Sequence, residues 1–434
     1  MTIGLEHRTA ISSLATKNPS ASGRPDKRTG RALILTGIVI IAANLRLGVS
    51  ATGPLLTDLQ STMHLGSALT ALLPTLWVLC FAAAGPTGSW LARRHGAGAV
   101  VGASLAVLVA GSAVRGIPDP AGLLAGSVLA GFGIALANVL LPVVVRTYFP
   151  DRIGTVTGIY MTTLAVGATF AAGSAVPLAN AFGSPSEGLA FWTLPALVAL
   201  GVWAMSRGAR HQQDVRAAHP ALGPTTPHIP LARAARSKLA WATAVAFGLQ
   251  SMAGYVIMGW LPSVLHESGM TQTAAGTVLS LIFAVSIPLS FFVPHFAGRK
   301  TDQRPMALAL GVVFAGGFTG MIFAPAALAY LWAVLLGIGM AAFPLVLTMI
   351  GLRGGTPVGT AALSAFSQSA GYLIAAIGPL GFGLLGHALH SWSVPLAIMV
   401  VVVLAQGVVA AYVGSPKRGT LADELAARDA MLED

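Results

Sequence analysis

Charge is what this sequence has least of. Only 9% of its 434 residues are Asp, Glu, Lys or Arg, whereas a soluble domain carries roughly a quarter. Apolar residues make up 55%, and the mean hydropathy is +0.77. So little charge cannot cover so much apolar surface in water. The composition therefore excludes a soluble domain and predicts a multi-pass membrane protein.

Cysteine and enzyme motifs are also missing. The single cysteine, Cys80, lies in an apolar run, which excludes a disulfide framework and a cysteine-based metal site. The sequence has no Walker loop, no His-Glu-x-x-His, no Gly-x-Ser-x-Gly and no acidic cluster. We therefore expect no enzyme activity, no cofactor and no metal.

Long apolar segments account for most of the chain. A membrane-spanning helix needs about 20 apolar residues, and the 51 glycines and 26 prolines suit closely packed, bent helices. Twelve spans are predicted, near 32–57, 68–91, 98–115, 121–147, 154–181, 189–206, 239–265, 274–295, 306–324, 327–352, 359–386 and 393–413.

The 25 basic residues fall almost entirely on one side of these spans. Only Arg46 and Arg115 depart from that side, and Arg115 sits at the outer end of a predicted helix. Because cytoplasmic loops are rich in Lys and Arg, both termini are expected in the cytoplasm and the protein in the inner membrane. Topology explains the net charge of +11, so a nucleic-acid partner is not expected.

A repeat divides the chain into two halves. A shift of about 205 residues places Gly131-Phe132-Gly133 on Gly337-Ile338-Gly339, and Gly154-Thr155 on Gly359-Thr360. Two parallel repeats of six helices are typical of transporters whose substrate site lies between the halves. The predicted divisions are an N-terminal tail (1–30), a six-helix bundle (31–206), a linker (207–238), a second bundle (239–413) and a C-terminal tail (414–434).

Arg46 is the most informative residue. It follows twelve apolar residues and Asn44-Leu45, which places it about 20 Å along a helix. A charge at that depth costs about 2.5–3.5 kcal/mol and is usually functional. None of the fourteen acidic residues is predicted at its depth, so its guanidinium could hold a small anion. Helix carbonyls or polar side chains could satisfy it instead.

Proton coupling has no evident relay. No Asp, Glu or His falls mid-membrane in the sequence, although a proton-coupled carrier commonly uses one. Coupling through the substrate, through water or through a residue at a helix end stays open, as do exchange and uniport.

Other polar side chains fall at a similar depth and could bind a small polar substrate or bond between helices. They are Asn44, Asn138, Tyr160, Gln250, Tyr255, Gln368 and Tyr372. Pro142 and Pro344 occupy nearly equivalent repeat positions and could bend helices at gates or merely kink them. Arg93 and Arg94, in the loop after the second span, are further gating candidates.

Several motifs together resemble one transporter family. They are Asn44-Leu45-Arg46 with Gly53-Pro54-Leu55-Leu56, Leu91-Ala92-Arg93-Arg94-His95-Gly96, Asn138-Val139-Leu140-Leu141-Pro142, Thr157-Gly158-Ile159-Tyr160, Gln250-Ser251, Trp260-Leu261-Pro262 and Gln368-Ser369-Ala370-Gly371-Tyr372. The chain resembles the cyanate and 2-nitroimidazole transporters of the major facilitator superfamily over nearly all twelve helices. Ser89 and Arg93 replace the Gly and Asp of the superfamily's usual loop, which puts its usual gate contact in doubt.

The resemblance implies an all-α membrane protein of two pseudo-symmetric six-helix bundles. It also implies transport of cyanate, a nitroimidazole or another small polar molecule, and a monomer suffices because one chain holds both halves. Efflux of neutral drug-like compounds is an alternative. A channel or a non-transporting sensor is an alternative of another class.

Overall fold

The protein is built from helices. The computed structural model describes residues 27–206 and 229–433, and no strand occurs within those ranges. Most of the predicted N-terminal tail (1–26) and linker (207–228) lies outside them.

The first half contains the elements before the linker, joined by short turns. Its bounds are α1 Lys27–Ser50, η1 Gly53–Leu55, α2 Leu56–Thr62, α3 Ser67–His95, α4 Ala97–Val114, α5 Pro120–Tyr148, η2 Pro150–Arg152, α6 Ile153–Phe182, α7 Pro185–Ala190 and α8 Thr193–Met205.

The second half begins with a short helix of the linker. Its bounds are α10 Leu231–Ala234, α11 Lys238–Glu267, α12 Gln272–Arg299, α13 Arg304–Phe323, α14 Ala329–Met340, α15 Ala342–Arg353, α16 Pro357–Leu389, α17 Ser393–Val413 and α18 Leu421–Glu433.

Twelve helical stretches in the described ranges are long and apolar enough to cross a membrane, which confirms the predicted number. The tenth is interrupted at Ala341 between α14 and α15. Two segments predicted as tails contain helix: α1 begins at Lys27, and α18 lies within 414–434. Five of the thirteen residues of α18 are charged, so a search for long apolar runs does not detect this helix.

Local sequence sets where several helices begin and end. The side chains of Asp119, Ser237, Thr271 and Thr356 accept hydrogen bonds from backbone N–H groups in the first turns of α5, α11, α12 and α16. These residue types are preferred N-caps because they satisfy otherwise orphaned donors. Gly183, with φ of +82°, ends α6 in a left-handed conformation that suits glycine.

The two halves repeat in helix order and meet through two related helix pairs. Helix α12 begins 205 residues after α3, at 272 and 67. Across the interface, α3 packs along α16 and α6 along α12. These pairs are images of each other under the repeat, as expected for two pseudo-symmetric six-helix bundles.

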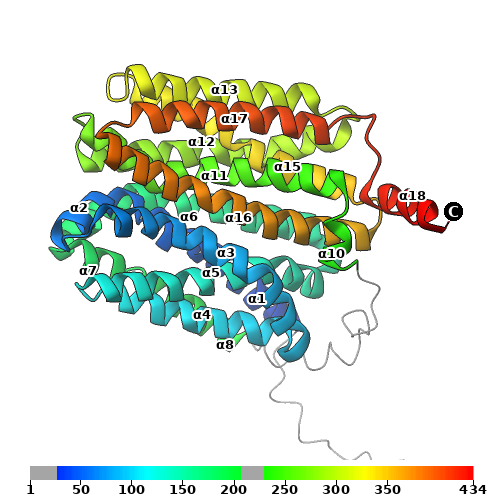
Figure 1. Ribbon diagram of the computed structural model, residues 1–434. Coiled ribbons are helices and arrows are strands. Elements are labelled where there is room, and N and C mark those ends of the chain that lie inside the picture. Colours follow the sequence, from blue (N-terminus) through cyan, green and yellow to red (C-terminus); the bar gives the residue numbers. More distant parts are fainter. Residues whose placement is uncertain (1–26, 207–228, 434) are drawn as a thin grey trace, which may run out of the picture.

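The bundle ends in two faces of different composition. Helices α3, α5, α12 and α15 end with arginine in their last turn at one end, called here the basic face. Helices α10 and α18 lie at this end in Figure 1, whereas α2 and α7 lie at the other, called here the opposite face.

The halves touch closely toward the opposite face. A Cβ added at Gly53 of η1 would lie 2.0 Å from the Met258 carbonyl oxygen of α11. Polar contacts there join Gln272 Nε2 to Asp58 Oδ1 at 2.7 Å and Thr57 Oγ1 to Ser263 Oγ at 3.3 Å. This end of the interface is therefore closed, with backbone in direct contact.

Candidate functional site

Arg46 lies on α1 at the interface between the bundles and is half-buried. Its guanidinium interacts electrostatically with the hydroxyls of Tyr255 on α11 and Tyr372 on α16. Within the described ranges, no carboxylate forms an ion pair with it. The centre of the molecule therefore holds a positive charge beside two phenols that belong to the other half.

Aromatic rings pack around the two tyrosines beside this charge. Phe81 of α3 lies 5.2 Å from the Tyr372 ring and 6.2 Å from the Tyr255 ring, measured between ring centroids. Phe247 meets Tyr372 edge-on at 5.0 Å. The Tyr255 hydroxyl has no hydrogen-bond partner of good geometry, although Arg46 approaches it. The site thus combines a flat apolar wall with an unsatisfied polar group and a cation.

The two predicted glutamines lie differently. The Gln368 amide donates to Ser364 Oγ at 2.8 Å, and Gln368 shares a face of α16 with Tyr372 because four residues turn a helix by about 400°. Gln250 and Tyr255 are five residues apart, about 140° around α11, so they lie on different faces of that helix. Gln250 lies nearer the direction of Gly254, which faces Met340 of α14. Both amide atoms of Gln250 are buried without a partner.

The structure directs Asn44 away from Arg46. The Asn44 amide donates to the carbonyl oxygens of Ile40, at 2.9 Å, and Pro195, at 3.1 Å, and so bonds α1 to the start of α8. Two residues turn a helix by about 200°, so neighbours at that spacing lie on opposite faces. Asn44 therefore joins helices within one bundle and is not brought into the site.

Asn138 and Tyr160 lie deeper toward the basic face. Asn138 is half-buried on α5, two turns beyond Gly131, which packs against Trp77 and Cys80 of α3. Tyr160 is buried on α6, two turns before Gly167, whose Cα packs on Ala43 of α1. Both residues thus lie on the interior-facing stripes of their helices, each about 11 Å along the helix from its packing glycine.

Arg115 is the residue that sequence reasoning underestimated. It follows the last residue of α4 as predicted, but it is only 1% exposed. Its guanidinium donates to the Gly48 carbonyl at 3.2 Å and to Thr52 Oγ1 at 2.7 Å, and lies 5.0 Å from the Trp77 ring centroid. The one signal in the sequence was that Arg115, like Arg46, does not fall on the basic side of the predicted spans. Arg115 holds the end of α1 where η1 meets α11.

A small pocket lies between Arg115's partners and the aromatic site. It is lined by Thr52, Trp77, Tyr255 and Met258 among others, and has room for about one water molecule. It reaches from the end of α1 to the Tyr255 side chain, so it lies on the line between the closed opposite face and Arg46. Larger molecules could enter only after the bundles separate there.

The predicted gating residues occupy ends and breaks of helices. Pro142 lies inside the unbroken α5, whereas Pro344 comes three residues after the break at Ala341. Arg93 and Arg94 are exposed in the last turn of α3, and the Arg94 guanidinium lies 5.7 Å from the Trp90 ring centroid. Of the two repeat positions, only the one in the second half therefore lies beside an interruption of its helix.

Comparison with known proteins places this geometry in a family. The family model described as Major Facilitator Superfamily matches residues 38–379. The chain belongs to the Major Facilitator Superfamily. It is therefore a multi-pass membrane transporter rather than an enzyme, and a small-molecule substrate and membrane lipid are its expected contacts.

Related transporters match over most of their lengths. The chain is 36% identical to the 2-nitroimidazole transporter of Escherichia coli K12, over 84% of this chain and 91% of that one. It is 30% identical to the cyanate transport protein CynX of the same organism, over 83% and 92%. An uncharacterized transporter of Bacillus subtilis 168, YycB, is 32% identical over 86% and 91%.

Solved structures share the fold. The xylose transporter XylE of E. coli, in its inward open conformation, superposes with a TM-score of 0.72 at 13% identity, over 92% of this chain and 99% of that one. A bacterial homologue of the lysosomal transporter Spinster gives a TM-score of 0.69 at 12% identity, over 90% and 98%. At these identities the similarity shows the fold alone and nothing about substrate.

Proposed function

We propose that the protein carries a small anion or a small polar nitrogen compound, cyanate-like or nitroimidazole-like, across the inner membrane by alternating access. Arg46 is the central binding charge in this proposal. The observation that carries it is a half-buried guanidinium at the interface between bundles, beside two phenols of the other half and without a carboxylate partner in the described ranges.

The chemistry of the site suits such a substrate. A guanidinium offers a planar fork of donors to an anion or nitro group, and the Tyr255 hydroxyl adds a polar atom that lacks a partner. The rings of Phe81 and Tyr372 offer flat apolar surface for a planar solute. The names of two relatives, a 2-nitroimidazole transporter and a cyanate transport protein, favour the same class of substrate.

The same proposal identifies the gates on either side of the site. The contacts of η1 with α11 form the closed gate, and we assign the opposite face to the outside and the basic face to the cytoplasm by the positive-inside rule. Both termini are then cytoplasmic. Separation of η1 from α11, with bending at Pro142 and Pro344 and rearrangement around Arg93 and Arg94, opens the site outward. One chain carries both bundles, so a monomer is the proposed working unit.

Binding tests the proposal directly. Thermal melting of detergent-purified wild type, Arg46→Gln and Arg46→Lys is measured with cyanate, nitrate, small carboxylates, nitroimidazoles and other azoles. A ligand at 100 times its dissociation constant stabilises the folded state by about 2.7 kcal/mol. We expect one anion or nitro compound to stabilise wild type, Arg46→Gln to lose that effect, and Arg46→Lys to retain part of it because charge remains.

Three other outcomes would replace the proposal. Equal stabilisation of wild type and Arg46→Gln by a neutral compound would make Arg46 structural and favour efflux of neutral compounds. Flux that neither saturates nor shows counterflow in vesicles would indicate a channel. Binding without flux would indicate a sensor.

A further inference from the structure

A second hollow lies at the basic face of the second bundle, away from the central site. Its volume is about 450 Å³, far more than the ~10–15 Å³ that one water molecule requires. We call it the basic pocket, and its lining includes Arg299, Lys300, Gln303, Leu352, Arg353 and Pro416. The end of α12, the end of α15 and the segment after α17 form its walls.

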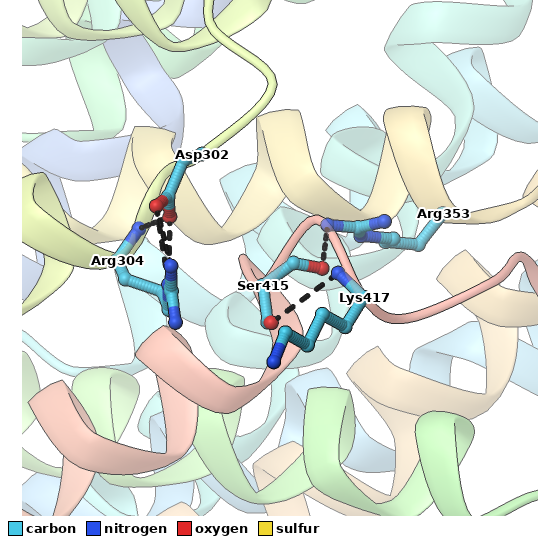
Figure 2. A network of polar contacts seen from close by, with 5 residues as sticks. All are labelled: Asp302, Arg304, Arg353, Ser415 and Lys417. Carbon is cyan, nitrogen blue, oxygen red and sulfur yellow. Dashed lines mark hydrogen bonds and ion pairs between the residues drawn. The ribbon is translucent and has the colours of Figure 1, made fainter.

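The basic pocket carries positive charge that no acid in its lining offsets. Arg299, Lys300 and Arg353 line it, and no Asp or Glu does so. The adjacent Asp302 forms an ion pair with Arg304 at 2.8 Å, which Figure 2 shows to one side of Arg353. The side-chain hydrogen bonds from Arg304 also lower the pKa of Asp302, so this carboxylate keeps its charge beside its own partner. The pocket therefore attracts an anion from outside the protein.

Buried polar groups hold the pocket in shape. The Gln303 backbone N–H donates to the Gly414 carbonyl at 3.1 Å, and its amide donates to the Ala297 carbonyl at 3.1 Å. The Arg353 guanidinium donates to the Ser415 carbonyl at 2.8 Å (Figure 2). It also donates to the Arg418 carbonyl at 2.7 Å. Its Nε–H is buried and has no partner. Carbonyls do not neutralise the charge, so Arg353 remains both a cation and an unsatisfied donor.

An apolar stripe leads from the pocket along α12. Phe292, Phe296 and Arg299 are spaced by four and three residues, so they lie on one face of that helix. The two rings are 50% and 51% exposed and stack on each other with centroids 6.5 Å apart. Apolar rings exposed on a membrane-spanning helix face the lipid chains, and basic side chains at the end of the helix lie at the level of the headgroups.

From this juxtaposition we propose that the basic pocket binds the phosphate headgroup of an anionic phospholipid. Arg299 and Lys300 hold the phosphate beside the Arg353 guanidinium, and an acyl chain lies over Phe292 and Phe296. A basic pocket between helices at a membrane surface suits such a headgroup. The continuous aromatic stripe favours a lipid over free phosphate, which has nothing to place against it.

Titration of the purified, delipidated protein tests the site. Binding of phosphatidylglycerol, phosphatidylcholine and inorganic phosphate is measured by native mass spectrometry for wild type and the double variant Arg299→Gln/Lys300→Gln. Each basic side chain near a membrane surface contributes about fivefold to affinity for an anionic lipid. We therefore expect about 30-fold weaker binding of phosphatidylglycerol to the double variant, and little binding of phosphatidylcholine to either protein.

The matched control is Arg146→Gln/Arg152→Gln, which removes two exposed charges from the same face of the first bundle. It should bind phosphatidylglycerol like wild type. Equal binding to all three proteins would overturn the proposal, and so would competition by inorganic phosphate at the affinity of the lipid. If the double variant melts well below wild type without lipid, Lys300→Gln alone replaces it, with about a fivefold loss expected.

Discussion

Replacing Gly53 with alanine should open the gate at the opposite face. The new Cβ would lie 2.0 Å from the Met258 carbonyl oxygen, whereas even a close C–H···O contact spans about 3.3–3.6 Å. Because the obstructing atom belongs to the α11 backbone and not to a flexible side chain, η1 and α11 must separate by about 1 Å or more. The closed state carries this clash, and the open state does not.

The size of the effect follows from the cost of overpacking. Forcing a methyl group into a packed interface costs typically about 1–3 kcal/mol, which corresponds to about a 5- to 150-fold change in an equilibrium between two states. The ratio of the open to the closed state should rise by that factor. Arg115 and Thr52 belong to the same half as Gly53, so their bonds survive the separation.

Maleimide labelling measures this population. Thr57→Cys, in a Cys80→Ala background, places a thiol where the wild-type hydroxyl meets Ser263 Oγ at 3.3 Å. Detergent-purified protein makes both faces accessible to the reagent. Labelling should accelerate by about 5- to 150-fold with Gly53→Ala, whereas Gly66→Ala, which has no atom within 4 Å of its new Cβ, should leave the rate unchanged. If Gly53→Ala is labelled at the same rate as the protein with Gly53, the contact between η1 and α11 is not a closed gate.

Two further substitutions test packing at the two ends of the molecule. Arg115→Gln should destabilise the protein by about 3 kcal/mol, because two hydrogen bonds from a charged donor are each worth about 1.5–3 kcal/mol. Chemical denaturation measures this change against a control variant, Arg152→Gln, which removes an exposed arginine. If Arg115→Gln is as stable as wild type, the cost of burying the charge cancels the hydrogen bonds that it makes. Glu424→Ala should release α18, because Glu424 accepts from Ser237 Oγ at 2.7 Å and from Lys238 N at 2.8 Å at the start of α11. Trypsin cleavage at Arg428 should then accelerate. An unchanged rate would show that the other contacts of α18, among them the Arg233–Asp429 ion pair and the bond from Arg428 to the Arg236 carbonyl, are sufficient to hold it.

The sequence by itself determined the class of protein, the number of spans and the family. These features depend on composition and on the length of apolar runs, which the bilayer imposes on each helix separately. The same logic located Arg46, because a charge after twelve apolar residues is visible without any knowledge of neighbours.

Only the tertiary structure decided which side chains meet. Asn44 and Arg46 are two residues apart in sequence, yet one bonds to the Pro195 carbonyl and the other approaches tyrosines of the opposite half. Arg115 ends its helix as predicted but is buried, because Gly126 and Gly48 leave space for its side chain. In a chain that is apolar throughout, hydrophobic periodicity is weak, so helix orientation is set by close packing between specific residues and cannot be read from the pattern alone.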